Sequence, residues 1–294
     1  MSNYEPLHFV QQDELPRDRK LISGQFVLYL SQNLLAYAIV DARHQRLHVL
    51  KSQIRKESAA VKDPYPAEVA QFLRDCQPAP DRFREARVIF DFRPVVWTPT
   101  PLISNGISWE SLLESSAGSV EGYQAHACPI DDAEAHIVFG YPMQLADLLE
   151  EYLPEASFWH GMAAWIAHLQ ERESTSHAPD RPRLYLDVQG HLLSVLLYRE
   201  EQLLLCNTYS CPGHSDALYF ALLALHIHQL KVEDCDCYLS GMIPSGGPLD
   251  QLLRQYLPQV QEIVFPEGWS FPTQMEVIPK KAYFKILGVV LCEL

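Results

Sequence analysis

Short apolar runs bounded by turn residues, with amphipathic stretches between them, predict an α/β chain in which strands and helices alternate. The predicted strands cover residues 25–30, 34–40, 46–50, 87–92, 135–139, 184–186, 192–198, 203–207 and 235–239. Helical spacing of apolar side chains predicts helices at 66–76, 143–152, 215–230 and 249–256. The polar, proline-bearing stretch 171–183 is the predicted linker between two halves.

The order of these elements repeats along the chain. The triplet Leu-Tyr-Leu occurs at 28–30 and again, 156 residues later, at 184–186, and a Leu-Leu pair follows each copy. Both halves therefore begin with a predicted three-stranded antiparallel meander and continue into helix, strand and helix, a βββαβα unit. Short leucine matches arise by chance, so the repeated order carries more weight than the identities. The pattern predicts an internal duplication.

Composition restricts the classes of function. The chain has 294 residues, of which 48% are hydrophobic, a net charge of −14 and seven cysteines. Binding to nucleic acid or anionic lipid over a broad surface needs clustered lysine and arginine, which this balance disfavours. No apolar run approaches the roughly 18 residues that a membrane-inserted helix needs. Dispersed cysteines in odd number, behind an N-terminus without a secretory signal, predict a cytoplasmic protein with reduced thiols.

Most of the negative charge lies in one quarter of the chain. From residue 94 to residue 171 there are eleven acidic residues and no lysine or arginine. Two groups, Asp131-Asp132-Glu134 and Glu150-Glu151-Glu155, are dense enough to form a patch if the fold brings them together. The segment is either a solvated face that aids solubility or a docking face for a cationic protein surface. It cannot supply its own cations to a phosphate ligand.

The duplicated βββαβα unit resembles the actin, Hsp70 and sugar-kinase superfamily, and within it the actin-like proteins of type IV pilus and type II secretion assembly. Residues 204–209, 216–222 and 283–292 are similar to an uncharacterised bacterial domain-of-unknown-function family. That likeness covers nearly the whole chain and brings no known activity. Together the two resemblances imply an actin-like α/β fold with lobes 1–178 and 179–294, the C-terminal segment packing back on the first lobe.

In that superfamily, two Asp-x-Gly hairpin turns clasp the phosphates of a nucleotide, and an aspartate holds hydrated Mg²⁺. The first turn of this chain is Ser31-Gln32-Asn33, which has neither residue type. The second turn, 187–191, keeps Asp187 and Gly190 but spaces them one residue too far apart. Loss of the first carboxylate removes most of the electrostatic stabilisation that phosphoryl transfer requires.

The adenosine side of such a site is a strand that runs into two glycines and a helix. Gly241, Gly246 and Gly247 stand at the corresponding place, but extra residues separate Gly241 from the other two. With Asp187 and Gly190 they make up the nucleotide cleft that the resemblance implies. It is a degenerate cleft, with at most weak binding of Mg·ATP.

Other chemistry has little support in the sequence. Cys206, Cys211, Cys235 and Cys237 lack the spacing of zinc knuckles, and the last two alternate on a predicted buried strand. No nucleophile elbow, Walker loop, dinucleotide fingerprint or His-Glu-x-x-His occurs. The sequence therefore predicts no metal site and no catalytic residue.

Two functional hypotheses follow. The favoured one is a cytosolic actin-like scaffold that does not hydrolyse nucleotide and that binds a protein with a basic surface or associates with itself. The alternative is an ATPase or switch that still binds ATP through the degenerate cleft. The first turn distinguishes the two hypotheses, because an ATPase needs a carboxylate near Ser31.

Overall fold

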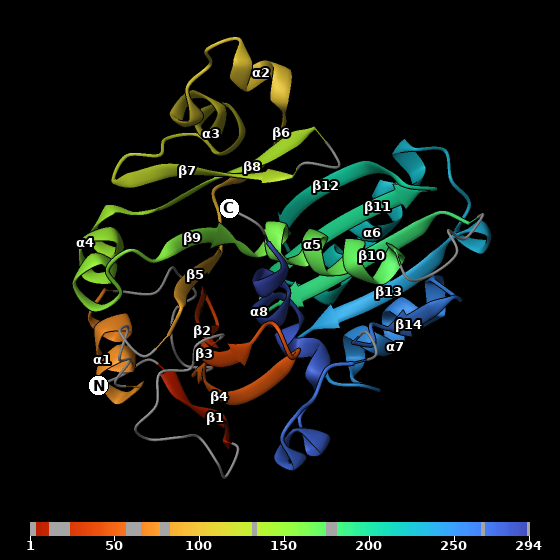
Figure 1. Ribbon diagram of the computed structural model, residues 1–294. Coiled ribbons are helices and arrows are strands. Elements are labelled where there is room, and N and C mark those ends of the chain that lie inside the picture. The colour runs from red at the N-terminus through yellow and green to blue at the C-terminus, as the bar shows by residue number, and fades with distance from the viewer. Residues whose placement is uncertain are drawn as a thin grey trace.

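The structure is a computed structural model that describes residues 4–11, 24–56, 66–76, 83–130, 134–174, 181–265 and 268–292. It is a mixed α/β structure with three sheets, two of which form the cores of two lobes (Figure 1). The third and smallest sheet belongs to a segment inserted into the chain of the first lobe.

The first lobe is built on a six-stranded sheet in the order β1-β4-β3-β2-β5-β9. The meander β2-β3-β4 is antiparallel, and β5 and β9 extend it in parallel beyond β2. Every residue of β2 is buried, as expected of a central strand covered on both faces. The strands are β1 Tyr4–Gln11, β2 Gly24–Ser31, β3 Leu34–Asp41, β4 Arg46–Arg55, β5 Glu85–Asp91 and β9 Ser157–His160.

The second lobe repeats this strand order without a counterpart of β1. Its sheet runs β12-β11-β10-β13-β14, with an antiparallel meander and then two parallel strands. The Leu-Tyr-Leu triplets 28–30 and 184–186 lie in β2 and β10, which hold the same position in the two orders. Origin of the halves by duplication stays a prediction. The strands are β10 Arg183–Gln189, β11 Leu192–Arg199, β12 Gln202–Ser210, β13 Asp236–Gly241 and β14 Val260–Glu262.

The inserted segment, residues 95–152, contains most of the acidic stretch and is called the insert below. Its sheet has the order β6-β8-β7, and α3 packs on it through a small core of Leu113, Val120 and Val138. In Figure 1 the small sheet of the insert with α2 and α3 forms the top of the molecule, and α4 lies at the left. Its elements are β6 Val95–Pro99, α2 Thr100–Ser104, α3 Trp109–Ala117, β7 Tyr123–Ile130, β8 Ala135–Pro142 and α4 Met143–Tyr152.

The sheet of the second lobe separates two hydrophobic cores. Leu184 and Leu186 of β10 pack with α6 and α7 on one face, whereas Tyr185 between them joins the larger core on the other face. Figure 1 shows α5 in front of this sheet and α6 behind it. None of the described helices is long and apolar enough to cross a membrane. The longer helices are α1 Pro66–Cys76, α5 Gly161–Ser174, α6 His214–Ile227 and α7 Pro248–Tyr256.

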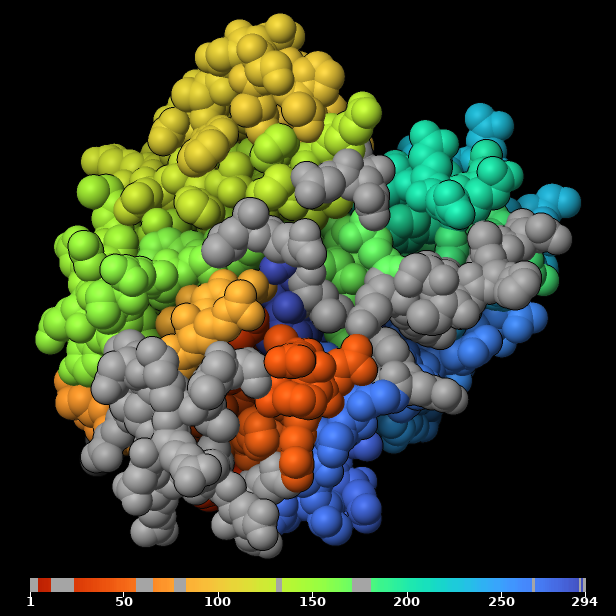
Figure 2. Space-filling model, viewed as in Figure 1, coloured from red at the N-terminus to blue at the C-terminus, as the bar shows by residue number. Residues whose placement is uncertain are grey.

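The C-terminal segment, residues 280–292, lies between the two lobes. Every residue from Lys281 to Val290 is buried, and only a small dark blue area shows on the face in Figure 2. The hydroxyl of Tyr283 is 2.8 Å from the hydroxyl of Ser52 in the first lobe. The segment contains η5 Lys280–Tyr283, α8 Phe284–Gly288 and η6 Val289–Leu291, and the shorter turns η3 Val232–Asp234 and η4 Thr273–Val277 precede it.

Gly288 allows the segment to approach α5 closely. A Cβ atom at Gly288 would lie 2.2 Å from the carbonyl oxygen of Ala164, a distance that no side chain tolerates. On the side of the second lobe, the side-chain amide of Gln189 donates to the carbonyl of Ala282 at 3.4 Å. The segment is thus attached to both lobes.

The predicted linker is shorter than the sequence indicated. Helix α5 continues to Ser174, so the first four residues of 171–183 are helical, and β10 already begins at Arg183. Residues 175–180 lie outside the described residues, and with them the predicted lobe boundary at 178/179. The bounds of helix α5 were not predicted, because its buried residues 161–166 lie on all sides of the helix and give no one-sided pattern.

Candidate functional site

Three charged side chains, one from each lobe and one from the C-terminal segment, meet in the buried centre of the molecule. Lys285 Nζ lies 2.9 Å from Asp91 Oδ2 and 2.9 Å from Asp187 Oδ1. The three residues are 2%, 4% and 1% exposed, respectively. They are called the central charge cluster below. At such depth each charge depends on the others, because an unpaired buried ion costs several kcal/mol.

Each carboxylate stands at the carboxyl end of a strand, opposite a serine on the neighbouring parallel strand. Asp91 ends β5 and is in register with Ser31 at the end of β2. Asp187 of β10 is in register with Ser240 of β13, whose hydroxyl donates to Asp187 Oδ2 at 2.7 Å. Strand β2 corresponds to β10, and β5 corresponds to β13. The aspartate is therefore on β5 in the first lobe but on β10 in the second, and the serine takes the other strand of each pair. The hydroxyl of Tyr29 donates to Asp91.

Asp91 is the functional candidate that sequence reasoning missed. The hairpin turn after β2 lacks a carboxylate, as the sequence indicated, but β5 brings one to the same edge of the sheet. The available signal was an aspartate that directly ends the apolar strand Val-Ile-Phe. Because the carboxyl ends of neighbouring parallel strands meet at one edge of a sheet, Asp91 was a second candidate, beside the turn at Ser31, for the carboxylate of the first lobe.

Burial and pairing act in opposite directions on the protonation of the cluster. Burial disfavours the ammonium of Lys285, but Asp187 and Asp91 outweigh it, and the pKa of Lys285 is raised. Burial also raises the pKa of Asp187, and the positive charge of Lys285 acts in the opposite direction. Burial and then the charges of Asp91 and Asp187 raise the pKa of Tyr29 well above its usual value, so the phenol remains a donor.

Two of the predicted cleft glycines lie beside the cluster, and packing within the chain requires both. Gly190 has φ +62°, and a Cβ there would lie 2.9 Å from Asn33 Cγ, so the tips of the two hairpins touch. Gly241 has φ +93°, and a Cβ there would lie 2.2 Å from the carbonyl oxygen of Val188. Asp187, Gly190 and Gly241 are thus brought together at the ends of β10 and β13.

Gly246 and Gly247 lie farther along, where the chain turns into α7. The backbone N–H of Gly246 donates to the Asp250 carboxylate at 2.7 Å, and Gly247 is the N-cap of α7. Both glycines have a structural role in starting this helix.

Lys281 ties that turn to the C-terminal segment. Its Nζ lies 2.5 Å from Glu262 Oε1 and 3.1 Å from Ser245 Oγ, and the residue is 5% exposed. Lys281 and Lys285 are four residues apart. Two lysines of one segment therefore contact both parts of the predicted cleft.

The residues present do not fit a Mg²⁺–phosphate group between the carboxylates. That position is held by the ammonium of Lys285, and a second cation there would meet strong repulsion. Among the described residues, no three His, Cys, Asp or Glu side chains are placed to hold a metal ion. Weak nucleotide binding through Asp187 and the four glycines stays a prediction.

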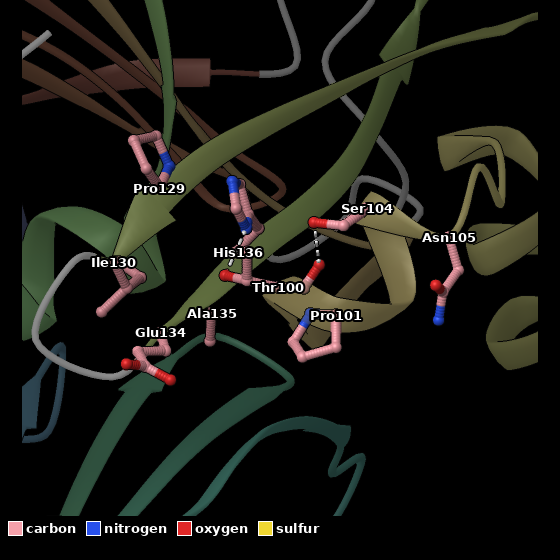
Figure 3. Close-up of a pocket in the computed structure, with 9 residues that line it drawn as sticks. All are labelled: Thr100, Pro101, Ser104, Asn105, Pro129, Ile130, Glu134, Ala135 and His136. Atoms are coloured by element: carbon pink, nitrogen blue, oxygen red, sulfur yellow. Dashed lines mark hydrogen bonds between the residues drawn. The ribbon is translucent and has the colours of Figure 1, made fainter.

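A separate hollow opens on the insert (Figure 3). It has a volume of about 640 Å³, and Ser104 Oγ at its side donates to the carbonyl of Thr100 at 3.1 Å. Glu134 supplies a carboxylate at one end. Such a lining can accept hydrogen bonds from a polar or cationic group. The lining residues are Thr100, Pro101, Ser104, Asn105, Pro129, Ile130, Glu134, Ala135 and His136.

The described acidic side chains of the segment 94–171 are exposed and unpaired. Within the described part of the chain none of them forms an ion pair. The two predicted groups do not meet: Glu134 precedes β8 and Glu150 follows it on α4, about 26 Å of strand apart. Asp131 and Asp132 lie outside the described residues. The exposed acids are Glu110, Glu114, Glu121, Glu134, Asp147, Glu150, Glu151 and Glu155.

Comparison with known structures shows that the fold is the actin-like ATPase fold. A Bacteroides thetaiotaomicron protein with actin-like ATPase fold and unknown function is 15% identical, with a TM-score of 0.73 over 92% of this chain and 96% of that chain. A chain of a PilM–PilN type IV pilus biogenesis complex is 15% identical, with a TM-score of 0.61 over 91% and 97% of the two chains. The ethanolamine utilization protein EutJ from Carboxydothermus hydrogenoformans is 8% identical, with a TM-score of 0.50 over 92% and 90%.

Residues 23–260 match the family described as a protein of unknown function, DUF3822, and the chain belongs to this family. Among curated proteins there is no match. The sequence resemblance to an actin-like fold and to a family of unknown function is confirmed.

Removing Lys285 should destabilise the whole molecule. We expect Lys285→Met to lower the free energy of unfolding by about 3–5 kcal/mol, because two buried carboxylates lose their cation. Urea unfolding at pH 7 measures this. The triple variant Lys285→Met, Asp91→Asn, Asp187→Asn should recover most of the loss. Lys280→Met, which removes only the contact with the Phe271 ring at 4.7 Å, should cost at most about 1 kcal/mol; an equal cost for both lysines would contradict the prediction.

His160, at the end of β9 beside the cluster, predicts a pH dependence. Its Nδ1 accepts from Met162 N–H at 3.1 Å, so Nε2 carries the proton and donates to the carbonyl of Phe92 at 3.2 Å. Burial lowers the pKa of His160 from 6.5 to about 4. Between these values the unfolded chain binds a proton that the folded chain does not, so stability falls as the pH falls.

The cost of His160→Gln should therefore shrink by about 2–3 kcal/mol between pH 7.5 and pH 4.5. Urea unfolding of both proteins at the two pH values measures the difference. The comparison isolates His160 from the other histidines, which are common to both proteins. A cost that is the same at both pH values would contradict the assignment of His160 as a neutral buried group.

Proposed function

We propose that this protein is an actin-like scaffold that does not hydrolyse nucleotide and that binds a protein partner through the acidic insert. The observation that carries the first half is the central charge cluster. Lys285 occupies the space between Asp91 and Asp187, and the C-terminal segment fills the region between the lobes. Because a cation of the chain itself lies between the two carboxylates, there is no space between them for a metal–phosphate group.

The acidic surface of the insert supports the second half of the proposal. Seven exposed carboxylates of the insert, and that of Glu155 just after it, form no ion pair within the described part of the chain and attract a basic surface, chiefly by raising the rate of association. The hollow beside Glu134 supplies hydrogen-bond acceptors for a lysine or arginine side chain. A structural relative is found in a complex with a protein, PilM with PilN, which supports a protein partner over a nucleic acid. A cytoplasmic location is part of the same proposal.

The alternative is a nucleotide-dependent switch. One observation favours it: the two carboxylates, one from β5 of the first lobe and one from β10 of the second, converge between the lobes. If the C-terminal segment moved out, taking Lys285 with it, both carboxylates would face the opened space. Such a switch would bind Mg·ATP only with displacement of a buried ion pair, which lowers its apparent affinity.

Calorimetric titration with Mg·ATP and a phosphate-release assay distinguish the two candidates. We expect no ATP turnover above the protein-free rate, and at most weak binding, because Lys285 holds Asp187. Hydrolysis that disappears in Asp187→Asn and persists in the exposed control Asp147→Asn would overturn the proposal. The isosteric amide is chosen because Ser240 can still donate to the side chain at this position.

Partner binding should depend on salt. A partner captured from lysate at about 0.05 M salt should be lost at about 0.5 M, because exposed charges are then screened within a few ångströms. Glu150→Lys with Glu151→Lys should weaken capture, whereas Glu233→Lys with Asp234→Lys, an exposed pair of the second lobe outside the acidic segment, should not. Capture of nucleic acid, or equal effects of the two pairs, would leave the insert as a solubility feature.

A further inference from the structure

A second hollow lies between the insert and the second lobe, and it shares Glu134 with the hollow of Figure 3. Its volume of about 360 Å³ is at the lower end of the range of ligand pockets, about 300–1,000 Å³, so it can hold a few residues of peptide but no folded domain. It is called the β6–β12 hollow below. Its lining residues are Trp97 from β6, Glu134, Ile166 and Gln170 from α5, Tyr198, Glu201, and Gln202 and Leu203 from β12.

The two strands that border this hollow are edge strands of different sheets. Strand β6 is the first in the order β6-β8-β7, and β12 is the first in the order β12-β11-β10-β13-β14. Figure 1 shows the right end of the insert sheet next to β12, and the described ladders do not join the two strands. Between Val95 and Thr208 only a slot of about 10 Å³ separates them, whereas the β6–β12 hollow opens farther along, beside Leu203.

The backbone of β6 presents polar groups without partners to this side. In an antiparallel ladder, alternate residues point their backbone groups toward the partner strand, and the residues between point them away. The carbonyl of Pro94 accepts from β8 at 3.0 Å, and Thr100 N–H donates to the carbonyl of Glu134 at 2.8 Å, so the even-numbered residues of β6 face β8. Trp97 therefore directs its N–H and C=O away from β8, as Pro99 does its C=O. Among the described residues none of these three groups has a hydrogen-bond partner.

The opposite strand is less available for pairing. Cys211 N–H donates to the carbonyl of His191 at 2.6 Å, so by the same alternation Thr208 points its backbone groups away from β11. The N–H of Thr208 already donates to Oδ1 of Asn207 at 2.8 Å. A side chain of β12 thus covers part of its own edge, and the open edge at the hollow is that of β6.

Both charged residues that line the hollow are acidic. Glu134 and Glu201 are exposed, and neither forms an ion pair within the described part of the chain. They come from opposite sides, Glu134 from the turn before β8 and Glu201 from the turn between β11 and β12. A cation placed between them would meet two carboxylates.

The arginines beside the second-lobe wall do not supply that cation. Arg183 is 2% exposed, lies 5.8 Å from the centre of the Tyr198 ring and donates to the carbonyl of Glu200. Arg199 donates to the carbonyl of His228, at the end of α6, at 3.5 Å. Neither arginine lines the hollow.

We propose that the β6–β12 hollow binds an extended segment of a partner protein that carries a lysine or an arginine. The segment pairs with Trp97 and Pro99 as an additional strand on β6, through up to three backbone hydrogen bonds. Its cationic side chain lies between Glu134 and Glu201. This inference rests on the proposed function, because it names the place and the chemistry of the partner contact.

Selection of phage-displayed random peptides of about twelve residues on the full chain tests the inference. We expect the selected peptides to share a lysine or arginine next to β-branched residues, which favour strands. As fluorescent free peptides they should bind with dissociation constants of about 10–100 µM. No selected peptide, or peptides without a shared cation, would overturn the inference. Peptides that match a segment of this chain would identify a second copy as the occupant and would overturn it too.

Charge variants locate the contact. Glu134→Gln with Glu201→Gln should weaken binding of the selected peptide about tenfold or more, whereas Glu233→Gln with Asp234→Asn should leave it unchanged. Thermal unfolding of each variant verifies that it is folded. Loss of binding in Glu150→Gln with Glu151→Gln instead would place the contact elsewhere on the insert, which overturns the inference and leaves the proposed function intact.

N-methylation of the peptide backbone tests the pairing. A strand added to β6 bonds to it through every second residue. Methylation of one set of alternate amides should therefore abolish binding, and methylation of the other set should preserve it. Equal effects of the two sets would overturn the inference.

Discussion

One ammonium group between two carboxylates holds the halves of this molecule together. Lys285 bonds Asp91 of the first lobe and Asp187 of the second, and all three side chains are removed from water. The favourable energy of such a triad depends on its completeness, because the loss of one partner leaves the others unpaired in a medium of low polarity. The angle between the lobes, the course of the C-terminal segment and the contact of the two hairpin tips all have to be compatible with these two ion pairs.

Much of the fold could be predicted from the sequence. The meanders that contain Leu28–Leu30 and Leu184–Leu186 and the helices at 66–76 and 143–152 follow from local apolar patterns. The bounds of helix α5 and the C-terminal helices were not predicted. Residues 161–166 of α5 and all residues of α8 are buried, so neither stretch shows the one-sided apolar pattern of a surface helix.

The candidate site was less accessible to sequence reasoning. Asp187 and the glycines 190, 241, 246 and 247 were found by resemblance, but their partners come from distant parts of the chain. Lys285 is 98 residues from Asp187 and 194 from Asp91. Its neighbours Phe284 and Ile286 are typical of an apolar core helix, but no local pattern in the sequence indicates that the lysine is buried. A charge cluster assembled over such separations is a property of the tertiary structure.

The position of Lys285 in the chain has a consequence for synthesis. All strands of both central sheets, residues 4 to 262, are translated before Lys285, so Asp91 and Asp187 exist for a time without their common cation. The lobes can form their own sheets during this interval, since domains fold as units while the chain grows. Two carboxylates repel each other across the gap until the lysine arrives. Until the segment with Lys285 has been made, closing the lobes would bury two carboxylates without their cation, and this cost disfavours closure.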